Sequence, residues 1–186
     1  MSTFVFQETK FKDVILITPT ALTDVRGSFF ESFKQSDFAA FGLPTSFVQE
    51  NQSRSQQGVL RGMHWQNMPA PQGKLVRVLH GAIQDVVVDI RKGSPNFGQW
   101  LAVELSAENM QQLWIPPGFA HGFVTLTHTA DVLYKTTGEY NKEAEGSFRW
   151  NDPVVGIVWE NKNPLLSEKD SKAPSLAKAI NTYILN

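Results

Sequence analysis

The sequence of 186 residues contains no cysteine. Disulfide bonds, thiolate catalysis and cysteine-bound zinc are therefore excluded. No apolar run approaches the roughly 18 residues that a membrane-spanning helix needs. The first ten residues also lack the cationic and apolar segments of a signal peptide, so we expect a cytoplasmic protein with no membrane partner.

A large excess of charge of either sign is also missing. Lys and Arg number 17 and Asp and Glu number 18, which gives a formal net charge of -1. Without a long run of basic residues, nucleic acid is not an expected partner. Hydrophobic residues make up 41% of the chain and charged residues 19%, so we expect a globular protein with a single domain over residues 1–186.

Short apolar segments separated by Gly and Pro predict a mainly β protein. Within residues 83–90, alternation places Val86, Val88 and Ile90 on one face of a strand. Many short strands with regular turns favour a jelly-roll barrel or sandwich. The other expected strands are residues 14–17, 47–53, 74–79, 100–105, 112–115, 122–126 and 132–137.

Helical signal is limited to two short segments. Residues 36–41 are expected to form one helix, with Ser36 as N-cap and Gly42 as C-cap. A second candidate starts after Ser167, because Ser167 and Asp170 have the spacing of a capping box. The tail beyond it has apolar residues roughly on one helical face, namely Leu176, Ala177, Ala179 and Ile180.

Two of the four His residues, His64 and His121, lie inside strand-like sequence beside a Gly, a residue that lets backbone segments come close together. His121 completes the Pro-x-Gly-x-x-His spacing of metal-binding cupin barrels. Such barrels also have two His one residue apart on an earlier strand, but His64 is followed by Trp65 and Gln66, so the second His is missing. Because His64 and His121 make only two ligands, we expect no metal centre. His80 and His128 lie near turns and are expected at the surface.

Proton transfer is the alternative role for His64. An imidazole has a pKa of about 6.5, which suits a general base near neutral pH. A carboxylate that fixes the ring tautomer would make it a better base. Spacing alone leaves that carboxylate open among Asp85, Asp89, Glu145 and Asp170.

Collinear segments throughout the chain match one known family. They are residues 24–31, 47–51, 58–66, 72–78, 85–91, 93–98, 113–123, 134–135, 145–146, 150–153 and 166–170. Over nearly its whole length the chain resembles the dTDP-4-dehydrorhamnose 3,5-epimerases. The resemblance implies a cupin-like jelly roll, a homodimer and no cofactor. It also implies inversion of dTDP-4-dehydro-6-deoxy-D-glucose at C3 and C5, which gives dTDP-4-dehydro-L-rhamnose.

The resemblance also implies a role for individual residues. His64 would be the base, and Tyr134 the acid on the opposite face of the sugar ring. Asp170 would orient His64, and Lys74 would stabilise the developing enolate oxygen. The implied substrate-binding residues are Arg26, Glu31, Gln49, Glu50, Asn51, Arg61, His121, Glu145 and Lys169.

Two features of the resemblance concern the completeness of the site. Arg26 and Glu31 lie on an early segment that crosses to the partner subunit in this family, so some sites would need a dimer. The family often has two adjacent aromatic residues where this chain has Glu139 and Tyr140, and one of them stacks on the base. Either Tyr140 takes that role or the loop differs.

Other functions remain open from the sequence. A relative of the same class would invert only C3 or only C5, or would isomerise the ketone. A metal-dependent cupin dioxygenase would need ligands that this chain lacks. A sugar-binding module without catalysis would not need His64, Lys74, Tyr134 and Asp170 together.

Overall fold

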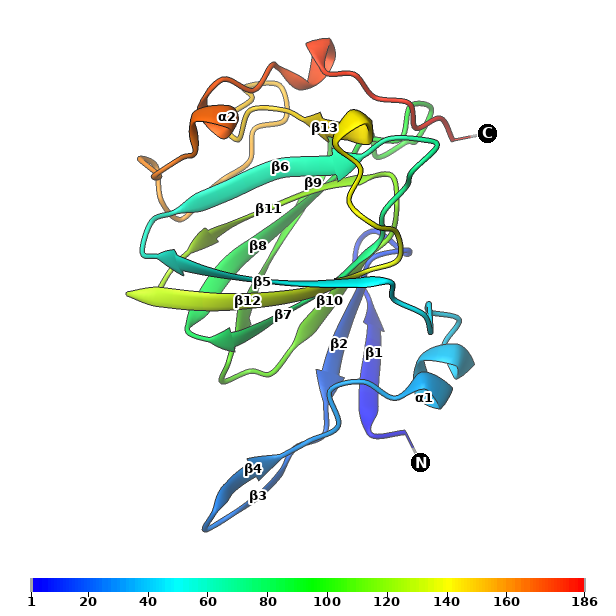
Figure 1. Ribbon diagram of the computed structural model, residues 1–186, viewed down its shortest axis with the longest axis vertical. Coiled ribbons are helices and arrows are strands. Elements are labelled where there is room, and N and C mark those ends of the chain that lie inside the picture. Colours follow the sequence, from blue (N-terminus) through cyan, green and yellow to red (C-terminus); the bar gives the residue numbers. More distant parts are fainter. Residues whose placement is uncertain (1, 186) are drawn as a thin grey trace.

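A computed structural model describes residues 2–185 of the chain. Most of its strands form two antiparallel sheets that lie one above the other (Figure 1). One sheet contains β1 (Phe4–Glu8), β2 (Ile15–Pro19), β5 (Gln49–Gln56), β7 (Lys74–His80), β10 (Gln112–Ile115) and β12 (Thr129–Thr136). The other contains β6 (Leu60–Gln66), β8 (Ala82–Asp89), β9 (Trp100–Ser106), β11 (Phe119–Thr125) and β13 (Glu145–Ser147).

The order of strands confirms the expected mainly β, cupin-like architecture. The six-stranded sheet runs β1-β2-β10-β7-β12-β5, and the five-stranded sheet runs β13-β6-β11-β8-β9. Neighbours in a sheet are often far apart in the sequence, so the chain passes repeatedly from one sheet to the other. The strands expected from residues 47–53, 74–79 and 83–90 correspond to β5, β7 and β8. The strands β1 and β13 were not predicted.

The buried apolar residues form three clusters, and the alternating side chains of β8 belong to two of them. Val87 faces the space between the sheets, where it joins a cluster with Val76 and Val132. Val86 and Val88 face the other side, as their alternation predicts, and join a second cluster with Phe148, Trp159 and Leu176. The C-terminal segment therefore covers the outer face of the five-stranded sheet, where it is drawn in orange and red (Figure 1). A third cluster lies on the six-stranded sheet beneath α1 (Gln35–Ala40).

The predicted N-cap of the first helix is wrong, and Gly42 follows the C-cap instead of forming it, with a φ of +81° that ends the helix. The helix α1 begins after Lys34 and its C-cap is Phe41, so Ser36 lies inside the first turn. The Ser36 hydroxyl contacts Asp37, and no side chain caps this helix. Phe38, which is 1% exposed, fixes the helix on the sheet instead, so tertiary packing rather than capping sets the helix position.

The second helix is confirmed at its start and wrong in its extent. The Ser167 hydroxyl accepts a hydrogen bond from the Asp170 amide, and α2 spans Glu168–Ser171. The tail then has only one 3₁₀ turn, Leu176–Lys178, and Ile180 is 80% exposed. A continuous helix does not form because Pro174 interrupts the chain and the tail backbone binds the barrel, for example through Lys92 and Tyr183.

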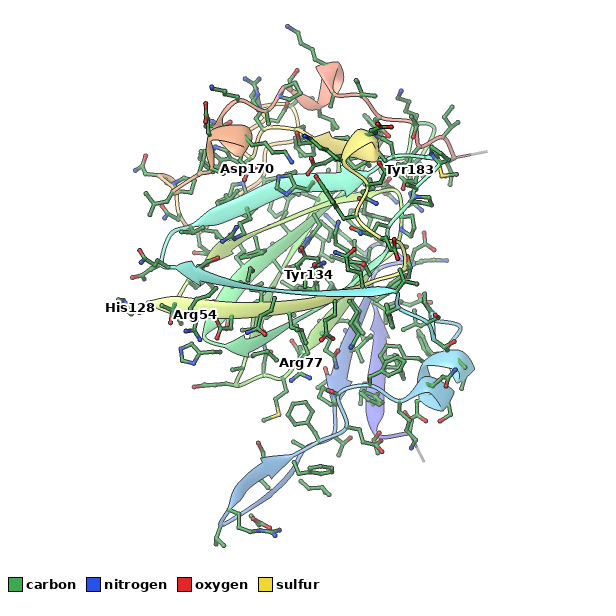
Figure 2. All side chains as sticks on the ribbon, viewed as in Figure 1. Arg54, Arg77, His128, Tyr134, Asp170 and Tyr183 are labelled. Carbon is green, nitrogen blue, oxygen red and sulfur yellow. The ribbon has the colours of Figure 1, made fainter. Side chains whose placement is uncertain are left out.

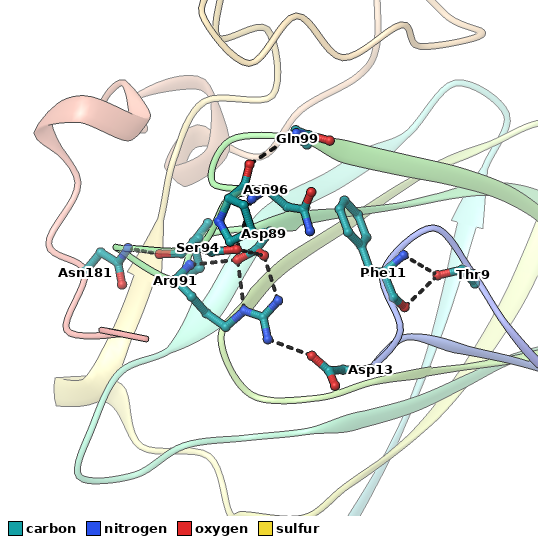
Figure 3. Close-up of polar contacts among 11 residues, drawn as sticks. Thr9, Phe11, Asp13, Asp89, Arg91, Ser94, Asn96, Gln99 and Asn181 are labelled. Atoms are coloured by element: carbon teal, nitrogen blue, oxygen red, sulfur yellow. Dashed lines mark hydrogen bonds and ion pairs between the residues drawn. The ribbon is translucent and has the colours of Figure 1, made fainter. Parts of the chain in front are cut away.

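A buried ion pair holds the chain after β8. The Asp89 carboxylate is fully buried and accepts hydrogen bonds from the Arg91 guanidinium and from the Ser94 hydroxyl (Figure 3). Arg91 also binds Asp13, which lies between β1 and β2. The same segment contacts the C-terminal tail, because the Asn181 side chain donates to the carbonyl of Ile90. The end of β8 is therefore joined to the connection between β1 and β2 and to the C-terminal tail.

The strands β3 (Leu22–Asp24) and β4 (Gly27–Phe29) form a hairpin that projects away from both sheets (Figure 1). Every residue of these two strands is exposed, including the apolar side chains of Leu22 and Phe29. Nothing else among residues 2–185 pairs with this hairpin in the sheets. Apolar residues held away from the core are typical of a surface that contacts another molecule.

Candidate active site

A cavity of about 500 Å³ opens between the sheets and beneath the C-terminal segment. Strands of both sheets supply its walls, with β7 and β12 on one side and β6 and β11 on the other. Residues 165–167, 169 and 170 complete the lining. Three distant parts of the sequence therefore contribute side chains to one space.

Two glycines let the strands that hold the His residues approach each other closely. A Cβ atom on Gly62 would lie 2.5 Å from the Cα atom of Gly122, and the φ of Gly62 is +135°. Only glycine adopts this backbone easily. The resulting register places His64 of β6 directly opposite His121 of β11. The prediction that the Gly near each His lets the backbone come close is thus confirmed.

His64 forms a hydrogen bond with the carboxylate of Asp170. The distance between His64 Nε2 and Asp170 Oδ1 is 2.5 Å, and the Asp170 side chain is 4% exposed. Burial acts to raise the pKa of Asp170, but hydrogen bonds and charge from His64, with help from Ser167 and Gly62, lower that pKa below its usual value. The carboxylate therefore stays ionised and leaves Nδ1 of His64 as the nitrogen that can accept a proton.

The other carboxylates that the sequence left open are engaged elsewhere. Asp85 lies 2.7 Å from Nε2 of His121, measured from its Oδ2 atom. Asp89 pairs with Arg91, as described above, and Glu145 forms an ion pair with Lys169 across the cavity wall. The structure therefore identifies Asp170 as the carboxylate that contacts His64.

Lys74 and Tyr134 project from the opposite wall. They lie on neighbouring strands, since β7 and β12 pair with Val76 opposite Tyr134. Tyr134 packs against the cluster between the sheets and lies between the two layers in Figure 2. His64 and Tyr134 thus face one cavity from different sheets.

Burial shifts the pKa values of both groups on this wall. Desolvation raises the pKa of Tyr134, and the charge of Arg61 opposes that effect. The phenol is therefore protonated at neutral pH. Desolvation lowers the pKa of Lys74 to about 8, although the charges of Asp85 and Glu145 act in the other direction. The amine is therefore a cation at neutral pH that loses its proton more easily than an exposed lysine.

Eight of the thirteen residues named from the sequence line this cavity. They are His64, Lys74, Tyr134, Asp170, Arg61, His121, Glu145 and Lys169. Gln49 and Asn51 are close to the cavity but do not line it, and their side chains bind each other at 2.9 Å. The residues Ser53, Gln66 and Gln72 line the cavity and were not singled out from the sequence.

The other three of the thirteen residues do not line the cavity either. Glu50 is exposed and pairs with Lys135, because alternation along β5 turns it away from the side that Gln49 occupies. Arg26 connects β3 and β4 and contacts Asp24. Glu31 follows the same hairpin and binds Thr3. The alternation of side chains along β5 is the sequence signal that Glu50 faces away from the side occupied by Gln49 and Asn51.

The described residues do not form a conventional metal site. Within residues 2–185, no group of three or more His, Asp or Glu side chains is arranged to hold a metal ion. His64 and His121 each direct Nε2 to a carboxylate. The helices of this part of the chain are also too short or too polar to span a lipid bilayer.

Comparisons with known proteins agree on one family. The family model described as dTDP-4-dehydrorhamnose 3,5-epimerase matches residues 8–178. The protein of that name from Pseudomonas aeruginosa is 54% identical over 169 residues, which are 90% of this chain and 93% of that protein. Its Salmonella typhimurium counterpart is 51% identical over 177 residues, or 94% and 97% of the two chains.

A solved structure is similar over the same length. It is the dTDP-6-deoxy-D-glucose-3,5-epimerase of Legionella pneumophila in complex with dTDP-4-keto-L-rhamnose, with a TM-score of 0.90. The two sequences are 46% identical, and the alignment covers 94% of each chain.

The charge of Lys74 should titrate near pH 8. In NMR of protein with labelled lysine side chains, one resonance should titrate with a pKa of about 8 and disappear in Lys74→Ala. Asp85→Asn should lower that pKa further, because it removes a negative charge that favours the ammonium. A Lys74 resonance that titrates with the exposed lysines, near about 10.4, would contradict the desolvation of this group.

Proposed function

The chain belongs to the dTDP-4-dehydrorhamnose 3,5-epimerase family, and from this we propose that it inverts C3 and C5 of dTDP-4-dehydro-6-deoxy-D-glucose to give dTDP-4-dehydro-L-rhamnose. One observation carries the mechanism. His64, with its carboxylate, and Tyr134 face a single cavity from opposite sheets. A sugar ring between them would have a base on one face and an acid on the other.

The base acts at carbons that flank the C4 ketone. Removal of the hydrogen at C3 or C5 gives an enolate, because the ketone accepts the electron pair and charge collects on O4. Nδ1 of His64 takes the proton. Asp170 holds the ring in the required tautomer and stabilises the imidazolium that forms, since its carboxylate is buried and ionised.

The opposite wall stabilises the enolate and returns a proton. The Lys74 ammonium is proposed to lie near O4, where one such donor typically contributes about 3–4 kcal/mol of transition-state stabilisation. Tyr134 then protonates the carbon from the face opposite His64, and this change of face inverts the centre. The phenol suits this step because its raised pKa keeps it protonated.

The remainder of the cavity is suited to a nucleoside diphosphate. Arg61 lines it, and a guanidinium can bind two phosphate oxygens at once. His121 and the pair formed by Glu145 and Lys169 supply further polar contacts. Tyr140 also lines the cavity with a side chain that is 56% exposed, so we assign it the stacking contact with the base.

A homodimer would complete the site. Arg26 lies at the turn of the β3–β4 hairpin, which projects away from its own barrel, and Glu31 follows the hairpin (Figure 1). Its exposed apolar residues, Leu22 and Phe29, are suited to burial against a second copy. We propose that the hairpin of each subunit reaches the cavity of its partner and brings Arg26 to the diphosphate.

Hydrogen exchange with solvent tests the chemistry. In heavy water, without added metal, the protein should exchange two carbon-bound hydrogens of the 4-keto sugar nucleotide for deuterium, as followed by proton NMR. His64→Ala should slow exchange at both carbons by about 10²–10⁴-fold. Tyr134→Phe should keep exchange but impair inversion, because proton removal does not need the phenol.

Three results would contradict parts of this proposal. Exchange at one carbon only would make the protein a mono-epimerase. Near-normal turnover of His64→Ala would refute the base, and inactivation by a chelator would refute the metal-free mechanism.

Mixed dimers test whether the site is shared. His64→Ala and Arg26→Ala should each have low activity alone. After the two variants exchange subunits, a heterodimer would contain one intact site, built from the barrel of one chain and the hairpin of the other. Equal mixing should restore about a quarter of wild-type activity. No recovery, with subunit exchange demonstrated by mass spectrometry, would show that each site uses its own hairpin.

A further inference from the structure

Gln66 binds the backbone of the loop that joins β12 to β13. This loop carries Tyr140 and connects the six-stranded sheet to the five-stranded one. Gln66 ends β6, and its side chain is almost completely buried. Its amide nitrogen donates to the carbonyls of Ala70 at 2.9 Å and Glu139 at 3.1 Å, and its oxygen accepts from the Asn141 amide at 2.7 Å. All the polar atoms of the side chain are therefore used to hold backbone.

Two more glutamines bind Gly138 and Tyr140 of the same loop. The Gln72 side chain donates to the carbonyl of Gly138 at 2.9 Å. The side-chain oxygen of Gln49, on β5, accepts from the amide of Tyr140 at 2.8 Å. Side-chain amides thus bind one backbone group of each residue from 138 to 141. Because Gln49 and Gln66 belong to different sheets, the loop is tied to both walls of the cavity.

The ring of Tyr140 has little support of its own. More than half of the side chain is exposed, and its hydroxyl lies 3.4 Å from Glu145. The direction of the ring is therefore set mainly by the backbone of its loop. Glu139 contributes its carbonyl to this network while its side chain is exposed, so the network does not require an aromatic residue at position 139.

We propose that Gln66 and Gln72 are positioning residues that hold residues 138–141 so that the Tyr140 ring is ready to stack on the base of the nucleotide. The inference rests on the proposed function, because it takes the ligand to be a thymidine nucleotide. A loop that is ordered before binding loses less conformational entropy when the ligand arrives, so it binds more tightly. Neither side chain hydrogen-bonds His64, Lys74 or Tyr134, so the proton transfers do not depend on them.

The test measures binding of dTDP by calorimetry together with kinetics of the epimerisation. Gln66→Leu and Gln72→Leu should weaken dTDP binding, by about tenfold for Gln66→Leu, and should raise KM while kcat stays within about twofold. In a Tyr140→Ala background, Gln66→Leu should cause no further loss of dTDP affinity, because the two changes act through the same ring.

Gln84→Leu is the matched control. Gln84 is also a buried glutamine of a strand, and its amide donates to Val158 and accepts from Glu160, which lie on the outer face of the five-stranded sheet. Its loss should lower the thermal midpoint much as Gln66→Leu does, yet leave dTDP affinity unchanged.

The outcomes separate the inference from the function on which it rests. Unchanged dTDP affinity in Gln66→Leu would overturn the inference. Additive losses in the double variant would also overturn it, because they would show an effect that does not pass through Tyr140. Failure of the wild-type protein to bind dTDP would instead refute the proposed function, and the inference with it.

Discussion

The hydrogen bond between His64 and Asp170 is the contact on which the rest of the site depends. An imidazole alone has two tautomers and a rotating ring, whereas a buried ionised carboxylate selects one tautomer and one orientation. That carboxylate reaches His64 from a segment 106 residues further along the chain. Its position follows from apolar packing, because the C-terminal segment covers the outer face of the five-stranded sheet and Ser167 caps the helix that holds Asp170.

The second constraint is the separation of the two sheets. A base and an acid that act on opposite faces of one ring must lie on opposite walls, and a barrel of two sheets supplies such walls without further adaptation. The same alternation that buries Val76 and Val132 between the sheets directs Lys74 and Tyr134 into the cavity. The low dielectric of the core then shifts the pKa values of these two groups in opposite directions, which keeps the phenol protonated and makes the amine easier to deprotonate.

Much of this arrangement could be predicted from the sequence, and the reasons are local. The mainly β fold and the two faces of β8 follow from alternation within a few residues. The Gly beside each His indicated close approach of two strands, which the pairing of β6 with β11 provides. The resemblance to a family supplied the candidate residues, and eight of them line one cavity.

The parts that could not be predicted depend on contacts between distant residues. Spacing could not distinguish Asp170 from Asp85 as the partner of His64, because the choice is made by the packing of the C-terminal segment. The tail was expected to continue as a helix, but its backbone binds the end of β8 instead. The amide network around residues 138–141 likewise joins groups that are up to 91 residues apart.

A crystal structure with a bound dTDP-4-keto sugar tests the central claim most directly. The measurement is which face of the sugar ring each group contacts. We expect Nδ1 of His64 on one face and the Tyr134 hydroxyl on the other, each within about 3.5 Å of C3 or C5. A ring with both groups on the same face, or one that leaves either group out of contact, would contradict it.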